Sequence, residues 1–259
     1  MKRRRAQTLM RDGLHYRREA FRHGLSLLGF EDKTYIGDPH PGDLLVIWNR
    51  SFRGAQEAEL FERAGAAVLI AENGLLGKGR NGGNWYSLAL HHVAGAGGNI
   101  NHGGPSRWDA MGISLAPWRT GGTGTLILGQ REIGEVGIKS PPAWAERTQE
   151  ACGGKIRKHP GKHAPTTTLE QDLASVEQVV TWASSAALQA LMHGVPVFHE
   201  HPAWVGAGAA RPLAEFGQEP KRDDAARLEM FRRAAWAMWQ IDEIDNGTAL
   251  RHVLGMNDA

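Results

Sequence analysis

The stretch at 178–198, QVVTWASSAALQALMHGVPVF, constrains the fold more than any other part of the chain. It opens with β-forming residues at 179–182, continues with helix-forming residues at 186–192, and returns to β-branched residues after Gly194. Glycine often ends a helix, because it adopts the left-handed conformation without steric cost. The order strand, short helix, strand predicts a βαβ unit and hence an α/β protein.

Two hydroxyl residues, Ser184 and Ser185, lie at the start of the helix in this unit. The first N–H groups of a helix have no partner inside the helix, and the helix dipole is positive there, so this end favours an anion such as phosphate. Serine at this position also commonly caps the helix with its own hydroxyl. Phosphate binding and simple capping therefore both stay open at this point.

The strand, helix, strand order is repeated in both halves of the chain. We expect the elements of the first half at 44–48, at 55–65 with Gly65 at the end of the helix, and at 66–73, and those of the second half at 125–128, 141–154 and 155–160. Each half places unusual residues at the carboxyl ends of its strands, which is where open α/β sheets bind ligands. A further helix is predicted at 223–241 from apolar residues spaced by three and four.

The length of 259 residues fits one large α/β domain or two of about 120 residues. The sequence PWRTGGTG at 117–124 is typical of a linker or sharp crossover, so we predict an N-terminal lobe at 1–121 and a C-terminal lobe at 122–259. The segment 74–122 is rich in Gly, Asn, His and Trp, and its part GAGGNINHGG lacks the Lys-Ser/Thr of a P-loop. We expect that part to shape an acceptor loop.

Composition places few other limits on function. The net charge is +2, the single cysteine is Cys152, and the apolar run at 25–30 is too short for a membrane span. One cysteine excludes an intramolecular disulfide and is typical of a reducing compartment. We therefore expect a cytoplasmic protein without stable membrane insertion, in the host cytoplasm if the chain is viral.

Basic residues are concentrated near the N-terminus. They are Lys2, Arg3, Arg4, Arg5, Arg11, Arg17, Arg18 and Arg22. Such a cluster can contact nucleic acid or an anionic glycan, and it is equally typical of the solvated face of an amphipathic helix. Among the nine tryptophans, Trp85 and Trp108 lie in glycine-rich sequence, where an indole stacks on a base or sugar or else holds a loop against the core.

Four short motifs follow one another in a fixed order. They are AENGLLGKG at 71–79, LILGQ at 126–130, IRKHP at 156–160, and the serine stretch followed by PAWVGAG at 202–208. Together they resemble the glycosyltransferases of capsule polysaccharide biosynthesis that transfer Kdo, which are related in motif to bacterial sialyltransferases and polysialyltransferases. The resemblance implies a GT-B fold, in which two Rossmann-like lobes enclose an interlobe cleft and the nucleotide sugar lies mainly on the C-terminal lobe.

The resemblance also implies roles for individual residues. Glu72 matches the general base that takes a proton from the acceptor hydroxyl, and Asn73 stands where the family often has Asp. His159 matches the His-Pro histidine that contacts the donor phosphate and helps the nucleotide to leave. A carboxylate at the end of a strand in an apolar surrounding has a raised pKa, which suits a base. A Glu-Asn-Gly turn and a strand-ending histidine remain simpler interpretations.

Further residues complete the predicted site. Ser184 and Ser185 match the Ser motif that holds the donor phosphate, and Gln130 and Arg131 match the turn after the first strand of the lobe. Strand alternation puts Arg157 on the same face as His159, so Arg157 is a further candidate for donor binding. On the acceptor side we expect the following residues: Asn73, Trp85, His91 and Trp108.

We accordingly predict an inverting, metal-independent glycosyltransferase that uses a CMP- or UDP-linked sugar as co-substrate and needs no cofactor. The sequences His199-Glu200-His201 and His91-His92 could bind a metal, but no HExxH helix, cysteine pair or Asp-x-Asp motif accompanies them.

The acceptor stays open between a hydroxymethylated base in bacteriophage DNA, which the basic N-terminus and the two tryptophans favour, and a capsule-type glycan. Two other classes of function also stay open. One is a nucleotide-sugar epimerase or hydrolase on the same fold, and the other is a non-catalytic protein that binds nucleic acid or glycan.

Overall fold

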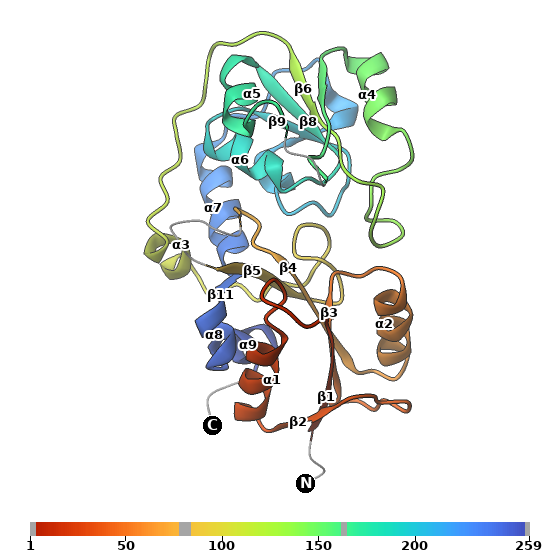
Figure 1. Cartoon of the computed structure of the whole chain (residues 1–259). Helices are drawn as coiled ribbons and strands as arrows, with labels where there is room; N and C mark the ends of the chain where they lie inside the picture. The colour runs from red at the N-terminus through yellow and green to blue at the C-terminus, as the bar shows by residue number, and fades with distance from the viewer. Residues whose placement is uncertain (1–3, 78–83, 162–164, 257–259) are drawn as a thin grey trace. The chain divides into compact units, whose positions relative to one another are not determined.

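The computed structural model describes residues 4–77, 84–161 and 165–256 and divides the chain into two compact units (Figure 1). Unit 1 comprises residues 1–94, 98–103 and 234–259, and unit 2 comprises residues 95–97 and 104–233. Lys2, Arg3 and the end of the motif AENGLLGKG at 78–79 lie outside the described residues.

Unit 1 contains a six-stranded sheet in the order β11-β5-β4-β3-β1-β2. Its strands are β1 (Arg4–Leu9), β2 (Phe30–Lys33), β3 (Leu44–Trp48), β4 (Ala67–Asn73), β5 (Trp85–Leu90) and β11 (Met238–Gln240). Strands β1 to β4 run parallel, β5 is antiparallel to β4, and β11 is antiparallel to β5. The carboxyl ends of β1, β2, β3, β4 and β11 therefore point to one edge of the sheet.

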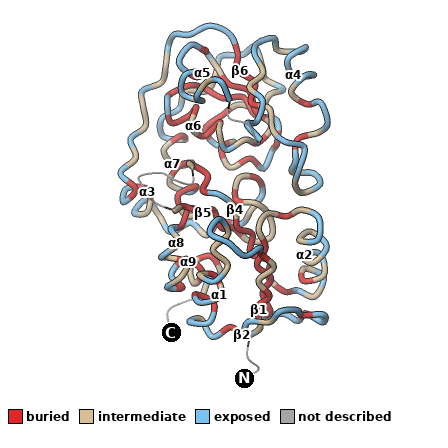
Figure 2. The backbone as a smooth tube through the Cα atoms, in the orientation of Figure 1, coloured by how far each residue is buried: buried red, intermediate tan, exposed pale blue. Residues whose placement is uncertain are grey.

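Helices cover both faces of this sheet, which a parallel sheet requires because its central strands are apolar on both sides. Leu69 and Ala71 of β4 pack with α1 (Arg18–Leu27), α8 (Ile241–Asp245) and α9 (Thr248–Val253) in one cluster, while Val68 and Ile70 face the opposite cluster beneath α2 (Arg53–Arg63). Figure 1 shows α2 on one side of these strands and α1, α8 and α9 on the other, and Figure 2 shows the strands between them buried.

Unit 2 contains a five-stranded sheet in the order β10-β9-β8-β6-β7, and all of its paired strands are parallel. The strands are β6 (Thr125–Leu128), β7 (Lys155–Arg157), β8 (Gln178–Thr181), β9 (Val197–His199) and β10 (Arg211–Pro212). The helices of this unit are α3 (Ser106–Ala110), α4 (Trp144–Cys152), α5 (Leu169–Ser175), α6 (Ala186–Met192) and α7 (Asp224–Ala235), the last two residues of which belong to unit 1. Within the described ranges, no helix has the length and apolar character needed to cross a bilayer.

The structure confirms the predicted α/β class and the strongest of the predicted elements. The strands at 44–48 and 125–128 and the helix at 186–192 have the predicted bounds. The predicted helix at 223–241 is wrong in its last turn and a half, because α7 ends at Ala235 and residues 238–240 form strand β11. Pairing with the open edge of β5, including the bond from the Leu88 amide to the Ala237 carbonyl at 2.8 Å, outweighs the helical spacing.

Because β11 belongs to the sheet of unit 1, the division of the chain differs from the predicted lobes at 1–121 and 122–259. Residues 104–121 group with unit 2, and residues 234–259 return to unit 1. A linker composition at 117–124 marks a crossover in the chain, but the sheet that a later segment joins depends on strand pairing over more than 140 positions of sequence. Composition alone carries no signal of that pairing.

The basic N-terminal segment is also built differently from the amphipathic helix considered as its simplest interpretation. Residues 4–9 form β1, which lies between β2 and β3, and the helix α1 starts only at Arg18. Three of the six described cations here have acidic partners: Arg5 with Asp43, Arg18 with Asp12 and Glu19, and Arg22 with Glu19 and Asp32. Paired cations attract phosphates weakly, so Arg5, Arg18 and Arg22 contribute little to a DNA-binding surface.

One of these pairs fixes the start of the sheet. The Arg5 Nε donates to Oδ1 of Asp43 at 3.0 Å, and the His40 amide donates to Oδ2 of Asp43 at 2.8 Å. Burial opposes ionisation of this carboxyl group, but the bonds from Arg5 and His40 outweigh it and hold the pKa of Asp43 below its ordinary value. The ionised carboxylate thus ties β1 to the start of β3.

We expect Asp43→Asn to lower the free energy of unfolding at pH 7 by about 1–3 kcal/mol, because a buried charged partner of Arg5 is lost. A depressed carboxyl pKa stabilises the fold above the unfolded value of about 3.9 and loses that effect as the pH falls further. Urea titrations at several pH values check this, with the exposed Asp38→Asn as control. Equal effects of the two substitutions would contradict the role of the pair.

Candidate functional site

The parallel strands of unit 2 bring the predicted donor residues to one edge of its sheet. The loops after β7, β6 and β8 lie side by side there, since β6 pairs with both β7 and β8. These loops carry His159, Arg131 and the serine pair at 184–185. Residues separated by more than fifty positions in sequence are thus gathered by the topology alone.

Gln130 connects two of these loops. Its side-chain oxygen accepts a hydrogen bond from the Ala183 amide at 2.8 Å, immediately before the serine pair. The predicted role in the turn after the first strand therefore becomes a positioning role: Gln130 fixes the loop that carries the serines.

The two serines differ from each other. Ser184 is half-buried, and its Oγ accepts from the Ala186 amide at 3.2 Å, so it caps the helix as the simpler interpretation expects. Ser185 is exposed, and its side chain makes no capping bond to α6. The hydroxyl that can reach a ligand is that of Ser185.

His159 is held in a defined tautomer. Its Nδ1 accepts from the Gly161 amide at 2.9 Å, so the neutral ring carries its proton on Nε2. Partial desolvation and then the positive charge of Arg131 lower the pKa of His159, which favours that neutral form. The ring presents one N–H donor beside an exposed guanidinium.

Arg157 has another role than the predicted one. Its guanidinium forms an ion pair with Asp172 and donates to the Thr167 carbonyl at 3.0 Å, at the start of α5. Asp172 is held by Thr167, Arg157 and Lys155, and together these overcome burial and lower its pKa. The charge of Arg157 is thus already neutralised, whereas the exposed Arg131 acts on His159 with its charge.

The histidines after β9 are structural in this arrangement. His199 and His201 are buried, and desolvation is the main cause that lowers the pKa of each. Both ring nitrogens of His201 are engaged, Nε2 with the Gly137 carbonyl at 3.2 Å and Nδ1 with the Ala203 amide at 3.2 Å. Over the described ranges, no group of three or more His, Cys, Asp or Glu side chains is placed to hold a metal ion.

In unit 1, Glu72 lies at the carboxyl end of β4. It pairs with Ser87 of β5, and the Asn49 amide donates to the neighbouring Ala71 carbonyl at 3.0 Å, so Glu72 lies between two other chain segments. Strand alternation puts its side chain on the face that α2 covers, opposite to Ala71. Desolvation by burial raises the pKa of Glu72 to about 7.

The rest of the Glu-Asn-Gly motif shapes the strand end. Asn73 is exposed, and its carbonyl accepts from Ser87 Oγ at 3.1 Å. A Cβ atom on Gly74 would lie 2.9 Å from the Cβ of Trp85, so only glycine allows β4 and β5 to stay this close. The glycine thus has a packing reason that does not depend on catalysis.

Three residues predicted on the acceptor side do not gather around Glu72. Trp85 is 8% exposed, and Trp108 is 3% exposed and stacks on Phe231 at 5.0 Å, so both rings belong to the core. The His91 amide donates to the Val68 carbonyl, and Nδ1 of His91 lies 3.1 Å from Oε1 of Glu62. Val68 precedes Glu72 by four residues of strand, so about 13 Å separates His91 from the level of Glu72. These differences follow from burial and from the direction of the strand, and the local sequence reveals neither.

The glycine-rich segment at 95–104 is likewise held in place. Asn101 donates from Nδ2 to the His252 carbonyl at 2.9 Å, and a Cβ on Gly103 would lie 2.4 Å from the Trp236 ring. Its glycines allow close packing, and this part of the prediction of an acceptor loop gains no support from the contacts.

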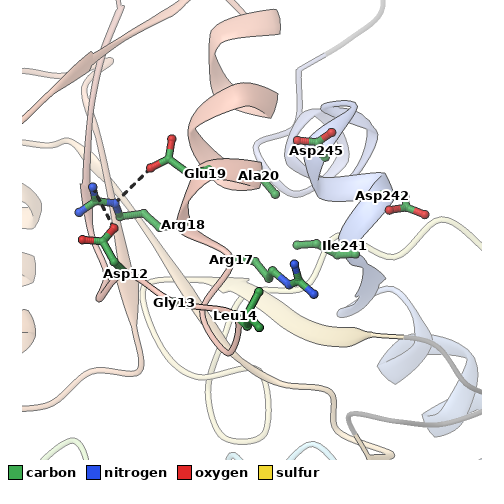
Figure 3. A pocket seen from close by; sticks show the side chains of 10 residues that line it. All are labelled: Asp12, Gly13, Leu14, Arg17, Arg18, Glu19, Ala20, Ile241, Asp242 and Asp245. Carbon is green, nitrogen blue, oxygen red and sulfur yellow. Dashed lines mark ion pairs between the residues drawn. The ribbon is translucent and has the colours of Figure 1, made fainter.

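A pocket that sequence reasoning missed lies in unit 1, between the loop after β1 and the start of α8 (Figure 3). Its volume is about 570 Å³, and charged side chains line most of it: Asp12, Arg17, Arg18, Glu19, Asp242 and Asp245. Arg18 is paired with Asp12 at 3.1 Å. The pocket lies at the same edge of the sheet as Glu72, but on the face that α1 covers. In the sequence, the pair Asp12-Gly13 soon after a strand is a signal for a turn at this place.

Comparison with known proteins gives a result only at the level of structure. No protein-family model and no curated protein sequence matches the chain. Two solved structures of Thermosulfurimonas dismutans KpsC do match it along nearly the whole length of both chains. One is described as a β-Kdo 2,7 transferase, with 13% identity, a TM-score of 0.54 and coverage of 95% of this chain and 98% of that one.

The other is described as a β-Kdo 2,4 transferase, with 13% identity, a TM-score of 0.55 and coverage of 93% of this chain and 97% of that one. The chain shares its fold with these β-Kdo transferases. The likeness confirms the coarser part of the prediction, a mixed α/β fold of the kind found in Kdo transferases. At 13% identity the likeness shows the fold alone.

The raised pKa of Glu72 leads to a prediction about stability. A carboxyl group whose folded pKa lies above its unfolded value loses stabilisation as the pH rises from about 4.5 to about 7. We expect Glu72→Gln, which cannot ionise, to have a free energy of unfolding about 2 kcal/mol above that of the wild type at pH 8, and the difference to shrink near pH 5. Thermal unfolding across this range checks it.

A suitable control is the exposed Glu59→Gln on α2. A Glu72→Gln variant that unfolds in parallel with this control at every pH would contradict the desolvated carboxylate.

Proposed function

We propose that the chain is a glycosyltransferase that transfers an acid sugar of the Kdo type from a CMP-linked donor to a hydroxyl group of a glycan. The observation that carries the proposal is Glu72, a carboxyl group at the end of strand β4 whose pKa burial raises to about 7. A base with that pKa accepts a proton near neutral pH. The fold shared with two β-Kdo transferases supports the same conclusion.

In the proposed reaction Glu72 takes the proton of the acceptor hydroxyl as its oxygen bonds to the anomeric carbon. The bond from that carbon to the donor phosphate oxygen breaks, and the electron pair stays on the phosphate. Attack from the opposite side inverts the anomeric configuration.

On the donor side, three groups of unit 2 are suited to the leaving phosphate. They are the N–H at Nε2 of His159, the hydroxyl of Ser185 and the guanidinium of Arg131. Preorganised donors aimed at developing negative charge supply much of an enzyme's rate enhancement. Because these groups can neutralise the phosphate, we propose a mechanism without a metal ion.

A glycan is a better acceptor than DNA on the evidence of the described residues. The features that favoured a DNA base were the basic N-terminus and two tryptophans. Arg5, Arg18 and Arg22 are paired with carboxylates, and the rings of Trp85 and Trp108 are buried.

Calorimetric titration of CMP, UDP and GDP into the purified protein tests the donor site. We expect the wild type to bind CMP. Ser185→Ala and His159→Ala should each raise the Kd for CMP about tenfold, which is the effect of losing a hydrogen bond to a charged group. His193→Ala, an exposed histidine at the other end of α6, is the matched control. Failure of every nucleotide to bind, or equal binding by all variants, would refute the proposed donor site.

Turnover tests the base. We expect Glu72→Gln to lower kcat at least a hundredfold while CMP binds as in the wild type, because proton abstraction is lost and donor binding is not. Wild-type kcat/KM should rise with pH up to about 7 and then level off, and the residual activity of the variant should lack this rise.

Product analysis separates the two other classes of function. Conversion of the donor without any acceptor would indicate a hydrolase or epimerase. Full function in Glu72→Gln would indicate a binding protein whose carboxylate is not used.

A further inference from the structure

Phe52 combines two features that stability alone does not explain. It stands between β3 and α2 with φ 49° and ψ −126°, a conformation that is strained for any residue except glycine. Its side chain is 82% exposed, so the phenyl ring gains little from burial in exchange for that strain. Glycine would adopt the same turn at lower cost.

The surrounding turn holds Phe52 in this conformation. Asn49 also has a positive φ, 43°, and its side-chain oxygen accepts from Ser51 Oγ at 2.8 Å. Arg50 is buried and donates to both carboxylate oxygens of Glu62 at 2.6 Å, which fixes the turn against α2. A strained residue that persists in a well-fixed turn is a candidate for function.

The turn lies beside the proposed base. The Asn49 amide donates to the Ala71 carbonyl, so Asn49 is level with Glu72 across the sheet. Phe52 follows three residues later, which limits its distance from Asn49 to about 10 Å, and it begins the helix that covers the same face as the Glu72 side chain. Both residues belong to unit 1, so their proximity follows from one sheet and its β3 to α2 connection (Figure 1).

We propose that Phe52 is the stacking platform for the acceptor sugar. Its exposed ring would pack against the apolar C–H face of a terminal pyranose and so direct a ring hydroxyl toward Glu72. This inference rests on the proposed function and adds the acceptor class, a pyranoside rather than a nucleobase or a lipid. An aromatic face offers a large, rigid and apolar contact to such a ring.

Steady-state kinetics with CMP-Kdo as donor and the methyl glycoside of Kdo as acceptor test this. We expect Phe52→Ala and Phe52→Gly to raise the acceptor KM at least tenfold with a smaller change in kcat, and Phe52→Trp, which keeps an aromatic face, to stay within about threefold of the wild type. Saturation-transfer NMR should show the C–H face of the glycoside near an aromatic ring only when residue 52 is aromatic.

Two controls separate stacking from folding. Tyr35→Ala removes another exposed ring, 61% exposed, beyond the edge strand β2, and should leave the acceptor KM unchanged. Phe52→Gly relieves the backbone strain, so its urea midpoint should equal or exceed that of the wild type even though its acceptor KM rises.

An unchanged KM in Phe52→Ala, or a loss of stability in Phe52→Gly that accounts for its KM, would overturn the inference. So would a wild type that binds CMP but neither binds nor glycosylates the methyl glycoside. A wild type that binds no CMP would instead refute the proposed function, so the two failures are distinguishable.

Discussion

Parallel strand pairing is the constraint on which the rest of this structure depends. A parallel sheet needs helices on both faces, because its strands are apolar on both sides, and it places every strand's carboxyl end at one edge. In unit 2 this brings together loops from three separate parts of the sequence. In unit 1 it places Glu72, the β3 to α2 turn and the charged pocket at a single edge, although they lie on different faces.

The surroundings of similar side chains then decide their chemistry. Asp43 and Glu72 are both carboxyl groups at strand ends in one sheet, but hydrogen bonds from Arg5 and His40 keep the first ionised, while desolvation favours the neutral form of the second. The same contrast separates Arg157, which Asp172 neutralises, from Arg131, which stays exposed. Asp43 and Arg157, whose charges are paired with other side chains, have structural roles, and we propose chemical roles for Glu72 and Arg131.

Aromatic side chains follow a similar rule. Trp85 and Trp108 lie in glycine-rich sequence, yet both are core residues: Gly74 lets the backbone approach Trp85 closely, and Trp108 stacks on Phe231. Phe52 lies in an ordinary strand to helix connection, yet it is exposed on a strained backbone. Sequence context alone therefore does not reveal which rings are exposed.

The sequence by itself determined the elements whose signal is local: the central apolar strands, the short helix after the serine pair, and the motifs at the strand ends. These follow from residue spacing and turn chemistry within ten or so positions. The tertiary structure decided that residues 238–240 join the sheet of unit 1, that Arg157 is paired, and that Phe52 is exposed near Glu72. Those outcomes depend on pairing, burial and charge between segments far apart in the chain, and these interactions exist only once the chain has folded.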